Sequence, residues 1–179
     1  MSKGHFFKKL RYPNVFVLLL IVFLSCALLI FINFFTIKIL SANRAYVNGE
    51  SHYSKGQKDA SRHLLTYLYT KDENQWNLYL EELKVPQGDG IARVTLLKVG
   101  DNEAARKGLL TGRNNEADLD DLVWLFVHFK EIPFLAKAIH EWEQGDKLIY
   151  QLFIIGQQID SKIKCDQLTD ADQQKFLQQ

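Results

Sequence analysis

VFVLLLIVFLSCALLIFINFFTI, residues 15–37, is the stretch that decides the architecture of this 179-residue chain. No charged residue occurs from Tyr12 to Ile37, and Ser25, Asn33 and Thr36 are the only clearly polar members of the quoted stretch. An α-helix rises about 1.5 Å per residue, so the stretch measures roughly 35 Å, which exceeds the roughly 30 Å of a bilayer's hydrocarbon core. Because lipid offers an open backbone no hydrogen-bond partner, the sequence predicts a membrane-spanning helix.

A cleaved signal peptide is the main alternative for this segment. The apolar region of such a peptide usually runs about 7–15 residues and ends at a small-residue cleavage site. The run here is longer, and no clean A-x-A site follows it. A lipoprotein signal would use Leu24-Ser25-Cys26, but Phe23 fits its first position poorly and a mainly apolar stretch, residues 27–37, would remain after cleavage. We therefore expect an uncleaved anchor.

Charge flanks the apolar run unevenly. No acidic residue occurs in residues 1–12, and the cations there are Lys3, Lys8, Lys9 and Arg11. Only Lys38 and Arg44 follow the run before Glu50. Since cationic flanks stay on the cytoplasmic side, we expect a single-pass protein with a cytoplasmic N-terminus and a main domain outside the cytoplasm. The net charge of +1 gives no basic field that would favour a nucleic-acid partner.

The predicted fold class is all-α: an N-terminal transmembrane helix continues into an extracytoplasmic helical bundle. The predicted parts are a basic cytoplasmic N-terminus (1–12), the transmembrane helix (13–40), a helical extracytoplasmic domain (41–165) and the start of an incomplete C-terminal helix (166–179). The first long helix should continue out of the membrane from about Ile39 to Tyr69, with Leu64 and Leu68 on its apolar face.

Proline and glycine gather in the middle of the domain. Asp72, with Gln75 three residues later, resembles a capping box and predicts a short helix through Leu83. The segment VPQGDG, residues 85–90, then predicts a loop. Residues 91–99 fit neither helical nor strand periodicity cleanly, and we assign them to a helix. Asp101 and Gly112 predict the start and the end of the helix that follows.

The last third of the sequence has clearer periodicity. The acidic residues 116–121 suit the positive N-terminal end of a helix, although residues 122–127 could instead form a buried strand. From Leu135 to Ile163, apolar and small residues recur at spacings of three and four, which predicts a long helix with a packing seam. Thr169 and Asp172 predict a final helix start.

Sequence signatures of catalysis, cofactor binding and metal binding are absent. The chain has no H-E-x-x-H, Walker loop, dinucleotide fingerprint or G-x-S-x-G elbow, and no Cys/His spacing resembles a zinc site. Cys26 lies in the apolar run and Cys165 lies near the C-terminus, so a membrane would keep these two apart. We expect no enzymatic activity, no cofactor and no metal.

Two polar groups are candidate ligand-binding residues. The first lies on about one and a half turns of the first long helix and consists of Tyr53, Lys55, Gln57 and Lys58. This group could bind an anionic ligand or form a solvated helix face. The second group, Asp89 and Arg93, stands at i and i+4 and could pair near a helix start or contact a ligand. The three tryptophans fit a hydrophobic core better than a pocket.

Four segments resemble the helical extracytoplasmic input region of bacterial membrane-bound sensor histidine kinases and diguanylate cyclases. They are NGESHYSKGQKDA (48–60), YLEELKVPQGDGIAR (79–93), DDLVWLFVHF (120–129) and AIHEWEQGDKLI (138–149). The resemblance covers residues 45–165. The matching positions are Glu50, Ser54, Lys55, Gln57, Lys58, Val85, Pro86, Gly88, Asp89, Arg93, Trp142, Gly145 and Asp146. The resemblance assigns no ligand to them.

The resemblance implies a sensory or signalling input module that responds to a small molecule or a protein. It also implies a bacterial inner membrane as the location, with the main domain in the periplasm. In that family a second transmembrane helix and an output domain follow, and neither is present in this sequence, so we expect a truncated or split sensor. Its expected partners are the lipid bilayer and either a second copy or a partner sensor protein. The alternatives are a membrane-tethered interaction or structural protein of the cell envelope and, with less support, an envelope hydrolase.

Overall fold

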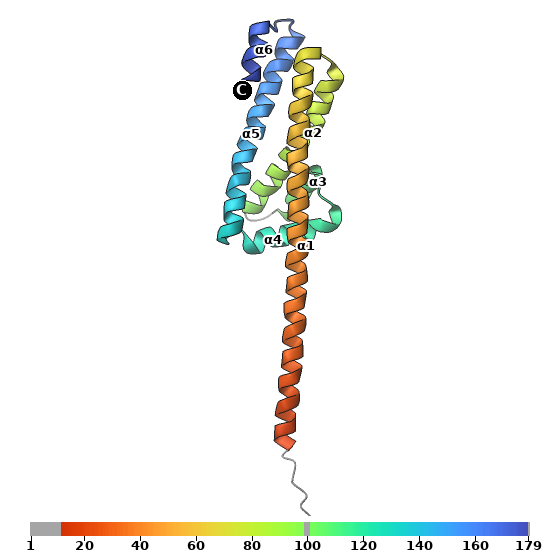
Figure 1. The fold of residues 1–179 in the computed structure, drawn as a ribbon, viewed down its shortest axis with the longest axis vertical. Coiled ribbons are helices and arrows are strands. Elements are labelled where there is room, and N and C mark those ends of the chain that lie inside the picture. The colour runs from red at the N-terminus through yellow and green to blue at the C-terminus, as the bar shows by residue number, and fades with distance from the viewer. Residues whose placement is uncertain (1–11, 99–100, 179) are drawn as a thin grey trace, which may run out of the picture. The chain divides into compact units, whose positions relative to one another are not determined.

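The structure is a computed structural model that describes residues 12–98 and 101–178. Over these residues the chain is all-α and contains no strand, as predicted. The helices are α1 (Tyr12–Thr70), α2 (Glu73–Leu97), α3 (Asn102–Thr111), the short 3-10 helix η1 (Glu116–Asp118), α4 (Leu119–Phe129), α5 (Pro133–Lys164) and α6 (Asp170–Leu177) (Figure 1). The four N-terminal cations and Val99 lie outside the described residues.

The chain divides into two compact units between Leu40 and Ser41, and α1 runs through this boundary without a break. In the first unit every described side chain from Val15 to Ile37 is exposed. Among the described residues, α1 is the one helix that is long and apolar enough to cross a membrane. An exposed apolar surface of this length is unfavourable in water and favourable in lipid, as the predicted anchor requires.

The second unit has its largest hydrophobic core where α1, α2 and α5 pack together. Its buried members are Ala60, Leu64, Tyr67, Leu68, Trp76, Tyr79, Leu83, Ile149 and Ile159. Tyr79 donates a hydrogen bond to Leu152 O at 3.0 Å, and its ring occupies the space beside Gly156. A Cβ atom on Gly156 would lie 2.3 Å from the Tyr79 hydroxyl, so the absence of a side chain lets the ring approach α5.

The loop predicted at residues 85–90 is wrong: α2 continues through it to Leu97, with Pro86 inside the helix. The glycines that suggested a turn are places of close packing instead. A Cβ atom on Gly88 would lie 2.7 Å from Gly108 O of α3, and one on Gly56 would lie 2.8 Å from Val85 Cβ. Tertiary packing against α1 and α3 thus overrides the local signal that proline and glycine give.

The predicted ends of the other helices agree well with the structure. Asp72 and Asp101 are N-cap residues, and Gly112 is the C-cap of α3. The capping box at Asp72 is incomplete, because the Gln75 side chain contacts His63 of α1 at 2.8 Å.

The later elements follow the predicted pattern too. Residues 122–127 belong to α4, so the strand alternative is wrong. The predicted long helix is α5, and α6 begins with a complete capping box between Thr169 and Asp172.

Candidate ligand-binding cavity

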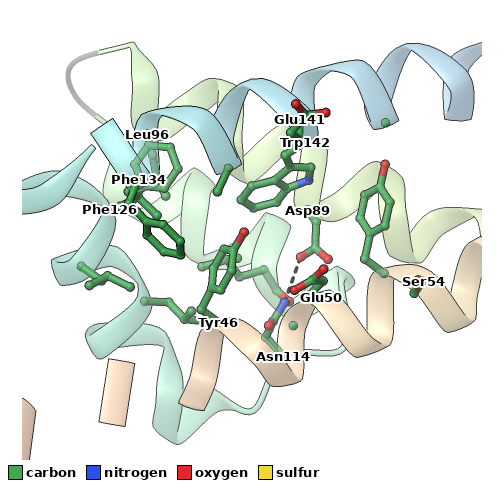
Figure 2. A pocket seen from close by; sticks show the side chains of 18 of the residues that line it. Tyr46, Glu50, Ser54, Asp89, Leu96, Asn114, Phe126, Phe134, Glu141 and Trp142 are labelled. Atoms are coloured by element: carbon green, nitrogen blue, oxygen red, sulfur yellow. Dashed lines mark hydrogen bonds between the residues drawn. The ribbon is translucent and has the colours of Figure 1, made fainter. Parts of the chain in front are cut away.

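The second unit contains an open cavity of about 490 Å³ that is lined by residues of five helices. Residues of α1, α2, α3, α4 and α5 contribute to it, together with Asn114 from the turn after α3. Figure 2 shows several of these side chains pointing into one shared space. A volume of this size is within the range of small-molecule sites in proteins.

One side of the cavity is apolar. Its lining residues are Leu96, Leu109, Leu122, Leu125, Phe126 and Leu135. Phe134, at the start of α5, also lines the cavity but is 81% exposed, so it forms part of the rim. This wall can accept an apolar ligand body, whose burial provides most of the affinity in sites of this kind.

The other side is polar and centres on Asp89 of α2, which is only 2% exposed. Asn114 Nδ2 donates a hydrogen bond to Asp89 Oδ1 at 2.9 Å and another to Leu109 O at 2.9 Å. Burial raises the pKa of Asp89 to about 8, because the charged carboxylate has lost its water, and the bond from Asn114 offsets part of this rise.

Glycines let these polar side chains lie against neighbouring helix backbones. A Cβ atom on Gly112 would lie 2.0 Å from Asp89 Oδ1, and one on Gly49 would lie 2.5 Å from Asn114 Oδ1. A Cβ atom on Gly145 of α5 would likewise lie 2.9 Å from the Tyr53 hydroxyl. The polar end of the cavity therefore depends on three positions where only hydrogen fits.

A buried ion pair stands beside this polar end. Arg93 Nε donates to Asp146 Oδ2 at 2.8 Å, and the two side chains are 8% and 19% exposed. Tyr53 Oη donates a longer hydrogen bond to Asp146 Oδ1, at 3.4 Å. Burial raises the pKa of Asp146, and Arg93 offsets part of that rise. Burial, with the nearby Asp146, also raises the pKa of Tyr53.

Trp142 of α5 has an unmatched donor at the cavity. The side chain lines the cavity, and its Nε1 atom is buried without a hydrogen-bond partner. Figure 2 shows the indole and the Asp89 carboxyl group directed into the same space. Buried donors are rarely left unsatisfied, because an unmade hydrogen bond costs about 1–3 kcal/mol. The Nε1 atom is therefore an unsatisfied donor within the wall of the cavity.

The charged residues that line the cavity are all acids: Glu50, Asp89 and Glu141. None of its described lining residues is lysine, arginine or histidine. Tyr46 lies beside Glu50, and burial together with the charge of Glu50 raises the pKa of this tyrosine. Aromatic rings and carboxylates therefore share the cavity, and its cationic neighbour Arg93 is engaged with Asp146.

The structure brings together only part of the predicted site. Three predicted residues line the cavity: Tyr53, Gln57 and Asp89. Arg93 is not part of the lining and pairs with Asp146. Two predicted residues, Lys55 and Lys58, are exposed and lie outside the cavity lining. The predicted Asp89–Arg93 pair is wrong: both residues lie inside α2, where Asp89 accepts from Asn114 and Arg93 binds Asp146.

Sequence reasoning missed Asn114, Tyr46 and Glu141 as members of the site. Asn114 follows the C-cap of α3 and gives no motif of its own, because its partner Asp89 is 25 residues away in sequence. Trp142 packs against a hydrophobic core cluster, as expected, and it also lines the cavity. Trp76 lies in the largest core.

Among the described residues, no group of three or more histidine, cysteine or acidic side chains could hold a metal ion. Comparison with protein-family models, with curated proteins and with solved structures finds no match to this chain.

Proposed function

We propose that this protein is a membrane-anchored input module that binds a small molecule in the extracytoplasmic cavity and passes the signal to a partner. The observation that carries the proposal is the cavity itself. A buried carboxyl group and the Trp142 side chain line it beside an apolar wall. Convergent polar groups within a largely apolar pocket are typical of ligand sites.

Positions singled out by the sequence resemblance support this proposal. Six of them line the cavity: Glu50, Ser54, Gln57, Asp89, Trp142 and Gly145. Two more, Arg93 and Asp146, form the buried pair next to it. They come from three different segments of the chain, so their meeting at one cavity is a property of the fold. The other five positions, Lys55, Lys58, Val85, Pro86 and Gly88, do not line the cavity.

Helix α1 offers a route for the signal. Its residues from Tyr46 to Gln57 line the cavity, and the same continuous helix contains the apolar segment. A ligand that favours one arrangement of α1 against α2 and α5 would shift the population of that arrangement. With the N-terminus in the cytoplasm and the cavity outside, such a change would reach a membrane partner through α1.

A ligand screen on the full chain in lipid nanodiscs tests this proposal. We expect at least one class of small molecule to raise the midpoint of thermal unfolding, since a ligand that binds only the folded state stabilises it. Ala138→Phe should fill the cavity and abolish that shift, because Ala138 lines it. Ala136→Phe is the matched control, since Ala136 is exposed on the same helix and outside the cavity lining.

The screen also has an outcome that refutes the proposal. If no compound class shifts the unfolding midpoint, or if Ala138→Phe shows the same shifts as the unsubstituted protein, the cavity is not a ligand site. Deleting residues 41–179 in the host should likewise abolish a response to the compound that binds.

A tethered interaction protein is the second candidate. Exposed apolar side chains on α5 favour it, because Tyr150 and Ile154 lie one turn apart and are 64% and 37% exposed. Crosslinking in native membranes distinguishes the two functions: this candidate predicts a stable protein partner together with a flat ligand screen.

A further inference from the structure

The cavity has a charge preference that narrows the class of ligand. All of its charged lining residues are acids, and the most deeply buried of them, Asp89, receives one hydrogen bond from an uncharged amide. A carboxylate kept from water without a cation is costly, unless it is protonated or a ligand provides the cation. Arg93 does not fill this role, because it binds Asp146.

Aromatic rings surround the same space. Tyr46, Tyr53, Phe126 and Trp142 line the cavity, and they come from α1, α4 and α5. The face of an aromatic ring attracts a cation, and ammonium ligands are commonly held between such rings and carboxylates. The remaining wall, with Leu122 and Leu135, offers no polar group.

We propose that the ligand is an organic cation: an amine whose ammonium group lies between the Asp89 and Glu50 carboxylates and whose apolar body packs against Phe126, Leu122 and Trp142. This inference rests on the proposed ligand-binding function. Burial favours the protonated carboxyl group, so Asp89 releases its proton to the solvent when the ammonium group binds, and the cation then stabilises the carboxylate in place of the lost water.

Three probes with one skeleton and different head groups test the inference. They are 4-phenylbutylamine, 4-phenylbutanol and 4-phenylbutyrate, which are cationic, neutral and anionic at pH 7. Binding is measured by isothermal titration calorimetry on the full chain in nanodiscs of zwitterionic lipid. Fluorescence of Trp142 provides a second readout, in a variant that carries Trp76→Phe and Trp124→Phe. We expect the amine to bind at least about tenfold more tightly than the alcohol, because hydrogen bonds between charged groups are stronger than those between neutral groups.

Substitutions locate the charge effect. Asp89→Asn keeps the shape of the side chain and can still accept from Asn114, so the alcohol should bind as before while the amine loses about tenfold or more in affinity. Glu50→Gln should weaken amine binding in the same direction. Glu81→Gln is the matched control, since it removes one exposed acidic charge from α2 outside the cavity lining and should leave all three affinities unchanged.

The outcomes separate this inference from the proposed function. If the alcohol or the carboxylate binds as tightly as the amine, or if Asp89→Asn leaves the preference intact, the cation assignment is overturned while the cavity remains a ligand site. If none of the three probes binds at millimolar concentration, the cation assignment is again overturned, and the broad ligand screen decides the proposed function separately. Circular dichroism of each variant establishes that it has folded.

Discussion

Asp89 should make the stability of the protein depend on pH in a direction opposite to that of most carboxyl groups. Its pKa is about 8 in the folded chain and about 4 when unfolded, so the folded state holds the proton more tightly. The free energy of unfolding should therefore fall as the pH rises from about 4 to about 8, by up to about 1.4 kcal/mol per pH unit, and level off above that range.

Asp89→Asn isolates this contribution. The asparagine does not titrate, so the difference in unfolding free energy between variant and unsubstituted protein should grow in favour of the variant from pH 5 to pH 8. Urea unfolding of the full chain in nanodiscs at several pH values measures it. A difference that stays constant with pH would show that Asp89 is ionised in the folded chain throughout this range, which would contradict the prediction.

Breaking the Arg93–Asp146 pair should cost much more stability than breaking an exposed ion pair. Both of its side chains are largely buried, so Arg93→Ala would leave the Asp146 carboxylate without its cation at a cost of about 3–5 kcal/mol. Arg106 and Asp120 form an exposed pair, and Arg106→Ala should cost at most about 1 kcal/mol.

The double variant with Arg93→Ala and Asp146→Asn should recover part of the lost free energy of unfolding, since a neutral amide needs no counter-charge. Equal losses for Arg93→Ala and Arg106→Ala, measured by urea unfolding, would contradict the role given to burial.

At the scale of helices, Gly56 shows how packing outweighs helix propensity. Alanine normally stabilises a helix interior by about 0.5–1 kcal/mol relative to glycine. At Gly56, however, the new Cβ would lie 2.8 Å from Val85 Cβ and 3.0 Å from Glu82 O, and overpacking of this kind costs about 1–3 kcal/mol. Gly56→Ala should thus lower the free energy of unfolding. Ser51→Ala on the exposed side of α1 is the control, and a stabilised Gly56→Ala protein would refute the close α1–α2 contact.

The end of α1 offers a stabilising change instead. Lys71 follows the helix with a φ of 56°, a conformation that costs a residue with a side chain about 1 kcal/mol and glycine little. Lys71→Gly should therefore raise the thermal unfolding midpoint, whereas Lys71→Ala should not. Arg113 has a similar φ of 62°, but Arg113→Gly should gain less, because it also removes the ion pair with Glu82. Equal midpoints for the two variants at position 71 would count against this account.

Local signals predicted the helices well and the cavity poorly, for a physical reason. Caps act within a few residues, so Asp72, Asp101 and Thr169 mark helix starts in the sequence itself. The pairing of Asp89 with Asn114 and of Tyr53 with Asp146 joins residues 25 and 93 positions apart, and periodicity contains no information on such partners. The glycines within residues 85–90 led to a wrong loop prediction for the same reason, because they allow close contacts with other helices and do not form a turn.

For the whole molecule, the unequal charge around the apolar run predicts an orientation in the membrane. Four cations precede residues 15–37, and Lys38 and Arg44 follow them. Cationic flanks resist translocation, so the N-terminus should stay in the cytoplasm and the cavity should face the outside. A receptor for an external ligand requires this orientation, so the proposed function depends on the predicted topology.

Fusing reporters to the C-terminus tests the orientation directly. Alkaline phosphatase, which becomes active only after export, should be active there, and green fluorescent protein sent through the general export pathway should be dark. Replacing Lys3, Lys8, Lys9 and Arg11 by glutamine while adding lysines after Leu40 should weaken or reverse this pattern, because the charge difference would then favour the opposite orientation. A fluorescent, phosphatase-inactive fusion of the unsubstituted chain would place the cavity in the cytoplasm. The ligand it binds would then have to be an intracellular one, and a route for external signals through α1 would no longer be tenable.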